Sequence, residues 1–262
     1  MNNIRIISLY SGSKGNATVI TSPAGTILID AGKNAKQLCK ALAEAGISPD
    51  EIGAILLTHE HNDHVSALPV FLKKHPIPVH LPVGCVYKLE GNPVIAPHLC
   101  PHPPRYTEEI CGLRVTSFAT SHDSRASVGY RIEIPTEDGI LRIGYATDVG
   151  YVSEEVEKSL LGCDAVVLES NHDVDMLMNG PYTYDLKMRV ASRKGHLSNY
   201  DSSLLACRLC ASGTRSLLLA HLSEENNTPD TAYDACVSTV ADPSVLVAVA
   251  SQDHITPMEI LL

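Results

Sequence analysis

The sequence predicts an α+β protein in which mixed β-sheets are covered by helices. Three observations favour this class. Short runs rich in β-branched residues are bounded by Gly, Pro, Asn or Asp, the early runs follow one another at hairpin spacing, and the later runs alternate with helical segments. The core must be built mostly from Val, Ile, Leu and Ala, because the 262 residues include no tryptophan and only two phenylalanines. A purely parallel, doubly wound sheet does not fit the early hairpins.

The chain begins with three expected strands at 4–9, 17–21 and 26–30, which are spaced as hairpins. The segment 11–16, SGSKGN, has the glycines and small polar residues of a turn between the first two strands. A contact between its exposed backbone N–H groups and an anion is the alternative interpretation. The spacing is not that of a P-loop.

The remaining elements are expected in the following order along the chain. They are a helix at 33–45, a strand at 54–58, a helix at 65–74, strands at 113–119, 128–134 and 141–146, a helix at 153–161, a strand at 165–169, helices at 184–192 and 199–211, a strand at 216–220, a helix at 228–240 and a strand at 245–249. The proline-rich stretch 97–104 is expected to be a surface loop. No linker, low-complexity tract or repeat divides the chain, so residues 1–262 are expected to form a single domain.

Charge and cysteine content restrict the classes of function. The net charge of −10 excludes a basic footprint over the whole protein, so a polyanion would have to be held by a local patch or by metal. The eight dispersed cysteines are expected to be mostly small buried residues in a reducing compartment, and Cys207 and Cys210 to share one helix face rather than bind zinc or exchange disulfides. Without a signal sequence or a long apolar run, we expect a cytoplasmic protein that does not enter a membrane.

The segment 56–65, LLTHEHNDHV, is the strongest indication of chemistry. An apolar run ends at Thr58, and three imidazoles and a carboxylate follow within six residues. In an extended loop His59 and His61 point the same way and can chelate one ion, because side chains alternate with period two. Asp63 and His64, at the start of a helix, can face a second ion. Four ligand-type side chains in this pattern predict metal binding.

Further candidate ligands follow other apolar strands. His122, Asp148 and His221 each come just after such a run and are expected at the same sheet edge as His59. An ionised Asp148 between two cations would be a good bridge, because it offers two oxygens. Asp30, at the end of the third strand, is expected to hydrogen-bond the ring N–H of a ligand histidine or to order the loop.

Together, HxHxDH at 59–64, the upstream Asp30 and the later His122, Asp148 and His221 resemble the motifs of the metallo-β-lactamase superfamily. The resemblance implies an αββα sandwich of two mixed β-sheets flanked by helices, with a dinuclear site at one edge. It also implies that His59, His61 and His122 hold the first ion, that Asp63, His64 and His221 hold the second, and that Asp148 bridges them. Nitrogen and oxygen ligands without thiolate suit zinc, manganese or iron.

Motifs beyond the ligands indicate the branch. KGHLSN at 194–199 and AHLS at 220–223 resemble ribonuclease Z, in which the first histidine donates a proton to the leaving oxygen. The resemblance implies that His196 is the general acid, a role that suits imidazole because its ordinary pKa lies near neutrality. The alternative is that His196 only caps the helix that begins near Asn199.

The resemblance is closer still to the WalJ/YycJ-type branch, through SGSKGN at 11–16, ESNHD at 169–173, GHLSN at 195–199 and HLSEENN at 221–227. Members of that branch are associated with nuclease activity on DNA. His172, within the second motif, is expected either to line the pocket and approach the metals or to be a hydrogen-bonded residue at a strand end.

We therefore expect a metal-dependent phosphodiesterase, an exonuclease acting on DNA, in which the ions activate a water molecule and His196 protonates the departing sugar oxygen. His196 and the ligand Asp63 are the expected catalytic residues. The candidate substrate-binding cations are Lys14, Arg125, Lys187, Arg189, Arg193 and Lys194, and the alternative is that these are solvated surface charges. Two other functions stay open: hydrolysis of a small phosphodiester or acyl ester, and a non-catalytic metal-binding regulatory module.

Overall fold

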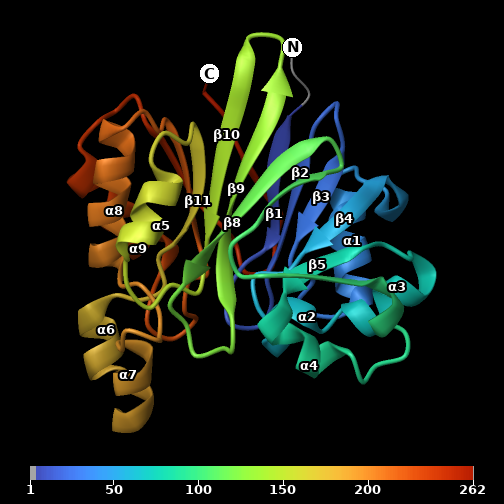
Figure 1. Ribbon diagram of the computed structural model, residues 1–262. Helices are drawn as coiled ribbons and strands as arrows, with labels where there is room; N and C mark the ends of the chain where they lie inside the picture. The colour runs from blue at the N-terminus through green and yellow to red at the C-terminus, as the bar shows by residue number, and fades with distance from the viewer. Residues whose placement is uncertain (1–3, 262) are drawn as a thin grey trace.

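The computed structural model describes residues 4–261 and contains two seven-stranded sheets packed face to face (Figure 1). The strands are β1 (Arg5–Tyr10), β2 (Ala17–Thr21), β3 (Thr26–Ile29), β4 (Ile52–Leu56), β5 (Val79–Pro82), β6 (Leu99–His102), β7 (Thr107–Ile110), β8 (Leu113–Thr120), β9 (Ser127–Thr136), β10 (Gly139–Ala146), β11 (Ala165–Glu169), β12 (Ser216–Ala220), β13 (Leu246–Val249) and β14 (Thr256–Met258). One sheet has the order β14-β1-β2-β3-β4-β5-β6, and the other β13-β12-β11-β10-β9-β8-β7.

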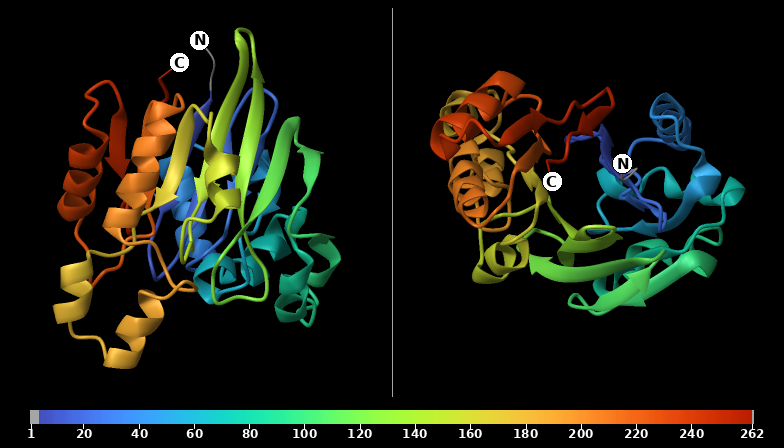
Figure 2. Two further views of the ribbon diagram at one scale, coloured as in Figure 1. Left: turned by 60° about the vertical axis from the view of Figure 1, so that its left-hand side comes forward. Right: turned by 90° about the horizontal axis from the view of Figure 1, so that it is seen from above.

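Helices cover the outer face of each sheet, so that the view from above shows four layers (Figure 2). The helices are α1 (Ala35–Glu44), α2 (Asn62–Val65), α3 (Leu68–Lys74), α4 (Val86–Leu89), α5 (Glu154–Leu160), α6 (Val174–Asn179), α7 (Tyr184–Val190), α8 (Asn199–Ala211) and α9 (Pro229–Val240). The expected αββα sandwich of two mixed sheets is confirmed. None of the helices in residues 4–261 combines the length and the apolar character needed to span a membrane.

The alternation of side chains along the strands builds three apolar layers. In β1, Ile6 faces the core between the two sheets, whereas Ile7 faces the core under α1 and α3. The third core lies between the other sheet and α5, α8 and α9, and is built from β11 residues such as Val166 together with helix residues such as Leu205. Aliphatic residues dominate all three layers, as the composition predicts.

Parallel pairing brings several strand ends to one edge of the sandwich. β3 pairs parallel with β4, and β10, β11, β12 and β13 run parallel to one another, while β8 and β10 share a direction because both are antiparallel to β9. The carboxyl ends of β8, β10, β11 and β12 therefore meet at the end of the molecule where α6 and α7 lie, opposite the chain termini (Figure 1).

Some expectations are wrong. The stretch 97–104 is not only a loop, because it contains β6, in which Pro101 pairs with Leu81. β6 is the edge strand of its sheet, where a proline that cannot donate a hydrogen bond is tolerated. The helix expected at 65–74 is two helices, α2 and α3, which a turn at Ser66 and Ala67 separates. The short elements β5, β7, β14, α4 and α6 were not expected.

All eight cysteines lie within the described residues and are free thiols. Cys207 and Cys210 are both on α8, and Cys210 is part of the apolar layer under this helix. The structure thus supports the interpretation that this CxxC pair belongs to one helix face.

Candidate metal centre

The carboxyl ends of six strands, or the loops that follow them, carry acidic and imidazole side chains to the common sheet edge. Asp30 follows β3, His59 follows β4, His122 follows β8, Asp148 follows β10 and His221 follows β12, and Glu169 is the last residue of β11. The backbones of Asp30, Asp148 and His221 have φ of 60°, 57° and 58°, a left-handed conformation that is costly for residues other than glycine. Such strain concentrates at functional sites, where the surrounding structure holds it in place.

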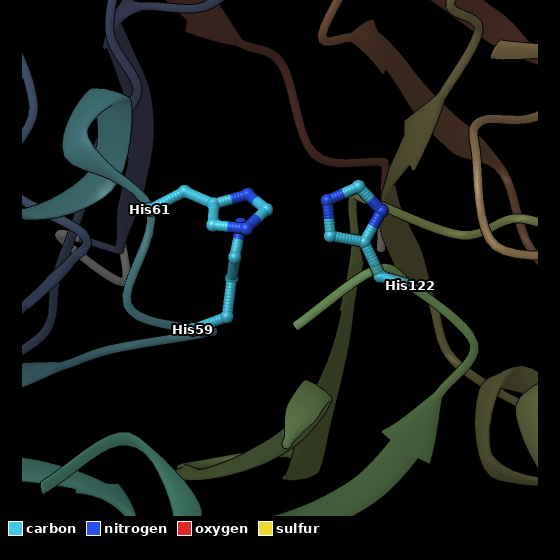
Figure 3. Close-up of side chains that lie close together, drawn as sticks. All are labelled: His59, His61 and His122. Atoms are coloured by element: carbon cyan, nitrogen blue, oxygen red, sulfur yellow. The ribbon is translucent and has the colours of Figure 1, made fainter. Parts of the chain in front are cut away.

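The first group of ligand-type side chains is His59, His61 and His122, whose rings point toward one another (Figure 3). The ring centroids of His59 and His61 lie 4.5 Å apart, and the centroid of His122 lies 5.0 Å and 5.1 Å from them. One nitrogen atom of each ring lies within 4.8 Å of the others. The three imidazoles can therefore contact a single ion.

A second group, Asp63, His64 and His221, also brings one atom from each residue within 4.8 Å. Asp148 lies between the two groups. Its Oδ2 atom is 3.4 Å from Nε2 of His64, and its Oδ1 atom is 3.7 Å from Nε2 of His122 and 3.6 Å from Nε2 of His221. All seven ligands expected from the sequence are brought together, with Asp148 in the middle.

Hydrogen bonds at Nδ1 orient the histidines toward this centre. Nδ1 of His64 lies 2.8 Å from Asp30 Oδ2, Nδ1 of His122 lies 3.1 Å from the backbone oxygen of Gly195, and Nδ1 of His221 lies 2.9 Å from Glu169 Oε1. An oxygen acceptor at Nδ1 places the ring proton there and leaves Nε2 free to bind a metal ion. Asp30 therefore has the position expected for it, and it also accepts a hydrogen bond from the backbone N–H of Thr58 at 2.9 Å.

Among the expected ligands, three buried atoms have no hydrogen-bond partner within the described residues: Nε2 of His59, Nε2 of His221 and Oδ2 of Asp148. Buried polar atoms without a partner are costly and call for an explanation, and a divalent cation would satisfy these three together. Imidazole nitrogens and carboxylate oxygens are suitable ligands for zinc, manganese or iron. The residues present thus fit a metal centre.

The electrostatics of the centre also favour bound metal ions. Burial opposes the charged form of His64 and His221, yet the nearby carboxylates raise the pKa of His64 well above its ordinary value and that of His221 to about 10. Burial also opposes the charge of Asp148, but the surrounding imidazoles hold the pKa of this carboxyl well below its usual range. Without cations the centre holds protons on His64 and His221, and divalent ions would compete with those protons for the same atoms.

One further residue, Glu169, supports the centre. Glu169, the first residue of the motif ESNHD at 169–173, is fully buried and accepts hydrogen bonds at Oε1 from Nδ1 of His196 and Nδ1 of His221, each at 2.9 Å. Its Oε2 atom accepts from the backbone N–H groups of Val149 and Leu197. A carboxylate that ends an apolar strand, as Asp30 does, is the sequence signal that could have identified Glu169.

The turn at 11–16 connects β1 and β2 as expected, and it also contacts the centre. Ser11 Oγ accepts a hydrogen bond from the backbone N–H of His221 at 2.8 Å. Asn16 Nδ2 lies 3.2 Å from Nε2 of His64 and 3.4 Å from Asp63 Oδ2. These contacts hold the ligand loops, a role for the turn that sequence reasoning missed.

His196 lies at the open side of the centre. The side chain is 20% exposed, and it lines a cavity of about 370 Å³ together with His61, Asp63 and other residues. Tyr182, Leu186 and Arg189, from the segment that contains α7, also line this cavity, the metal pocket. The N-cap of α8 is Ser198, whose side chain accepts from the backbone N–H of Asp201, so His196 does not cap the helix.

His172 does not belong to the metal pocket. It is buried after the end of β11, where its backbone oxygen accepts from the N–H of Asn199 at 2.8 Å, and its Nδ1 atom lies 3.4 Å from Asn171 Oδ1. Burial lowers the pKa of His172 to about 4, which keeps the ring neutral at neutral pH. This position agrees with the interpretation that His172 is a hydrogen-bonded residue at a strand end.

The candidate substrate-binding cations have different surroundings. Arg189 lines the metal pocket but forms an ion pair with Asp123, and Lys14 lies 2.7 Å from Glu224. Lys187 Nζ donates to the backbone oxygen of Met178, and the Arg193 guanidinium stacks on Tyr151. The remaining two, Arg125 and Lys194, line a neighbouring pocket. The six side chains therefore do not form one cluster in the metal pocket.

Comparison with known proteins agrees with the fold and the site. Residues 25–222 match the model of the β-lactamase superfamily domain. The exodeoxyribonuclease WalJ of Streptococcus pneumoniae is 31% identical over 260 residues, which cover 95% of each chain. The exodeoxyribonuclease YycJ of Bacillus anthracis is 30% identical over 257 residues, 95% of this chain and 93% of YycJ. The metallo-β-lactamase fold protein YhfI of Bacillus subtilis has 15% identity and superimposes with a TM-score of 0.72, covering 97% of this chain and all of YhfI, a likeness of fold alone.

Proposed function

Because this chain belongs to the β-lactamase superfamily, and within it to the WalJ/YycJ-type branch, we propose that it is a two-metal phosphodiesterase that degrades DNA from an end. The chain is a metal-dependent hydrolase. The proposal adds the substrate, the number of ions and the roles of the side chains. The proposal rests on the convergence of seven ligand-type side chains beside His196, which Glu169 holds at the open side of the centre.

The proposed ligands are His59, His61 and His122 for one ion and Asp63, His64 and His221 for the other, with Asp148 contacting both. When bound, the ions supply Lewis-acid stabilisation of the phosphoryl oxygens and lower the pKa of a water molecule so that it can attack phosphorus near neutral pH. Zinc, manganese and iron all suit this donor set.

In this mechanism His196 protonates the departing sugar oxygen. Its Nδ1 proton is held by Glu169 Oε1 at 2.9 Å, so Nε2 is the atom that can present a proton to the metal pocket. Burial opposes the charge of Glu169, yet His196 and His221 lower its pKa to about 2, so the carboxylate is ionised. An ionised carboxylate stabilises the protonated imidazole and holds the ring in one orientation.

Asp63 is the second proposed catalytic residue. Its side chain is 24% exposed, whereas that of Asp148 is 2% exposed, so Asp63 is the more accessible of the two carboxylates at the centre. Although burial opposes its charge, His64 and His221 hold the pKa of Asp63 well below its usual range. The ionised carboxylate can accept a hydrogen bond from the attacking water and orient it toward phosphorus.

The test is degradation of end-labelled DNA and RNA, single and double stranded, by metal-reconstituted enzyme beside the Asp63→Ala variant. We expect stepwise shortening of DNA by the wild type and none by the variant, and the product ladder gives the polarity. Activity on small phosphodiesters or acyl esters but on no polynucleotide would show that the substrate is a small ester and not DNA. Absence of hydrolysis of every substrate class, with metal content confirmed, would favour a non-catalytic metal-binding module.

A further inference from the structure

A second pocket lies directly beside the metal pocket and shares two of its wall residues, His61 and Asp123. We call it the side pocket. It has a volume of about 390 Å³ and is lined by Glu60, His61, Tyr87, Lys88, Asp123, Ser124, Arg125 and Lys194. Because His61 and Asp123 line both pockets, the two pockets are adjacent.

Three cationic side chains from separate segments meet in the side pocket. Lys88 comes from α4, Arg125 from the loop between β8 and β9, and Lys194 from the loop before His196. Within residues 4–261, none of the three has a carboxylate at ion-pair distance. Lys14, by contrast, is paired with Glu224. In a protein with a net charge of −10, three free cations around one pocket favour an anionic ligand there.

The two carboxylates of the side pocket already have partners. Asp123 is paired with Arg189. Glu60 accepts hydrogen bonds from Cys85 Sγ at 3.1 Å and from the Tyr87 hydroxyl at 3.2 Å, and its Oε1 atom lies 3.4 Å from the backbone N–H of Arg125. Neither carboxylate therefore forms an ion pair with Lys88, Arg125 or Lys194.

Glu60 also organises the pocket. By accepting from Tyr87 and from the backbone of Arg125, it places the Tyr87 ring under the Arg125 guanidinium, whose central carbon lies 3.8 Å from the ring centroid. A guanidinium stacked in this way is pre-oriented, and its N–H groups stay available to a phosphate. The exposed ring of Tyr87 can also stack against a nucleotide base.

We propose that the side pocket binds the phosphate adjacent to the scissile one on a single-stranded polynucleotide. The inference rests on the proposed function and adds a subsite to it. Lys88, Arg125 and Lys194 neutralise the neighbouring phosphate while the scissile phosphate lies at the metal centre. A small diester has only one phosphate, so the side pocket distinguishes a polynucleotide from a small diester.

The test compares two substrates of the metal-loaded enzyme, a single-stranded oligodeoxynucleotide and bis(p-nitrophenyl) phosphate. In the triple variant Lys88→Ala, Arg125→Ala, Lys194→Ala, we expect the ratio of kcat/KM on the oligonucleotide to kcat/KM on the small diester to fall roughly tenfold or more. The salt dependence of oligonucleotide affinity should weaken, because each phosphate contact on a single strand contributes about 0.7 to the slope of log K against log salt. The matched control replaces Lys36, Lys73 and Lys74, which are exposed on α1 and α3, and should leave the ratio unchanged.

An unchanged ratio in the triple variant overturns the subsite and leaves the nuclease proposal intact. An equal loss on both substrates also overturns it, because the cations would then support the metal centre itself. If the wild type cleaves no oligonucleotide, the proposed function fails, and binding of a labelled oligonucleotide in a His196→Ala background still tests the subsite. Equal affinity with and without the three cations would then contradict it.

Discussion

Glu169 Oε1 lies 2.9 Å from Nδ1 of His196 and 2.9 Å from Nδ1 of His221, so one buried carboxylate oxygen orients both the proposed proton donor and a proposed metal ligand. The three residues come from different segments of the chain, and their common contact links the position of the proton donor to that of the metal ligand. Replacement of the Glu169 carboxylate should therefore affect both catalysis by His196 and metal binding by His221.

The Glu169→Gln variant is expected to lower kcat/KM by roughly 10- to 100-fold and to weaken metal binding, because an amide offers one acceptor oxygen and points its NH2 group at backbone N–H donors. Steady-state kinetics and a metal titration measure the two effects. Glu44→Gln, on the exposed face of α1, is the control. Wild-type activity in Glu169→Gln would contradict the positioning role.

The His196→Ala variant is expected to lower kcat by about 10² to 10⁴ while the metal content stays that of the wild type, because His196 acts as a proton donor and not as a ligand. Kinetics and elemental analysis of the purified protein check this expectation. His254→Ala removes an exposed imidazole and is the matched control. Loss of metal in His196→Ala would show that its assigned role is wrong.

Metal loading is expected to release protons. In the cation-free centre the raised pKa values of His64 and His221 keep these rings protonated at pH 7.5, and divalent ions must displace the protons from Nε2. Calorimetric titration of zinc into chelator-treated protein, in buffers with different ionisation enthalpies, should give about one to two protons released per chain. Loading with no proton release would refute the ligand assignment of His64 and His221.

The Gly32→Ala variant is expected to weaken metal binding and stability, because a Cβ atom at Gly32 would lie 1.9 Å from the backbone oxygen of Asp63 and 2.6 Å from the backbone nitrogen of Asn16. The short helix α2, which carries Asp63, would have to move. Gly91→Ala has no atom within 4 Å of the added Cβ and should retain metal affinity. Thermal unfolding and metal titration of both variants test the difference.

The His80→Gln variant is expected to lose less stability on acidification than the wild type. Burial, with a smaller contribution from His102, lowers the pKa of His80 to about 4, compared with about 6.5 in the unfolded chain. The unfolded chain therefore takes up the proton first, so this contribution to stability is complete above pH 6.5 and is lost as the pH falls toward 4.

Between pH 7.5 and pH 5, the decrease in the free energy of unfolding should be smaller in His80→Gln by about 1 kcal/mol, roughly half the full linkage value because the ring is partly exposed. Urea unfolding at the two pH values measures this difference. His254→Gln, an exposed histidine, is the control. Identical pH dependence in the wild type and His80→Gln would contradict the pKa assigned to His80.

Local sequence determined the strands that lead into the site. The runs 165–168 and 216–220 are continuous and apolar, each is followed directly by a residue of the site, Glu169 or His221, and the structure has these strands at the expected positions. Elements such as β6 and β14 could not be predicted from their own residues. Each depends on pairing with a strand distant in sequence, as Met258 pairs with Ile6, and on an edge position that tolerates proline.

The sequence by itself determined which residue types are present for metal chemistry: the spacing in HxHxDH and the strand-end positions of His122, Asp148 and His221 identify them without any knowledge of contacts. Only the tertiary structure decided that Glu169 joins His196 to His221, and that Arg125 and Lys194 meet Lys88 in a separate pocket. The reason is physical. Ligand spacing within one loop is a local property of the chain, whereas hydrogen-bond partners and charge clusters arise where parallel pairing brings the ends of distant strands to one edge.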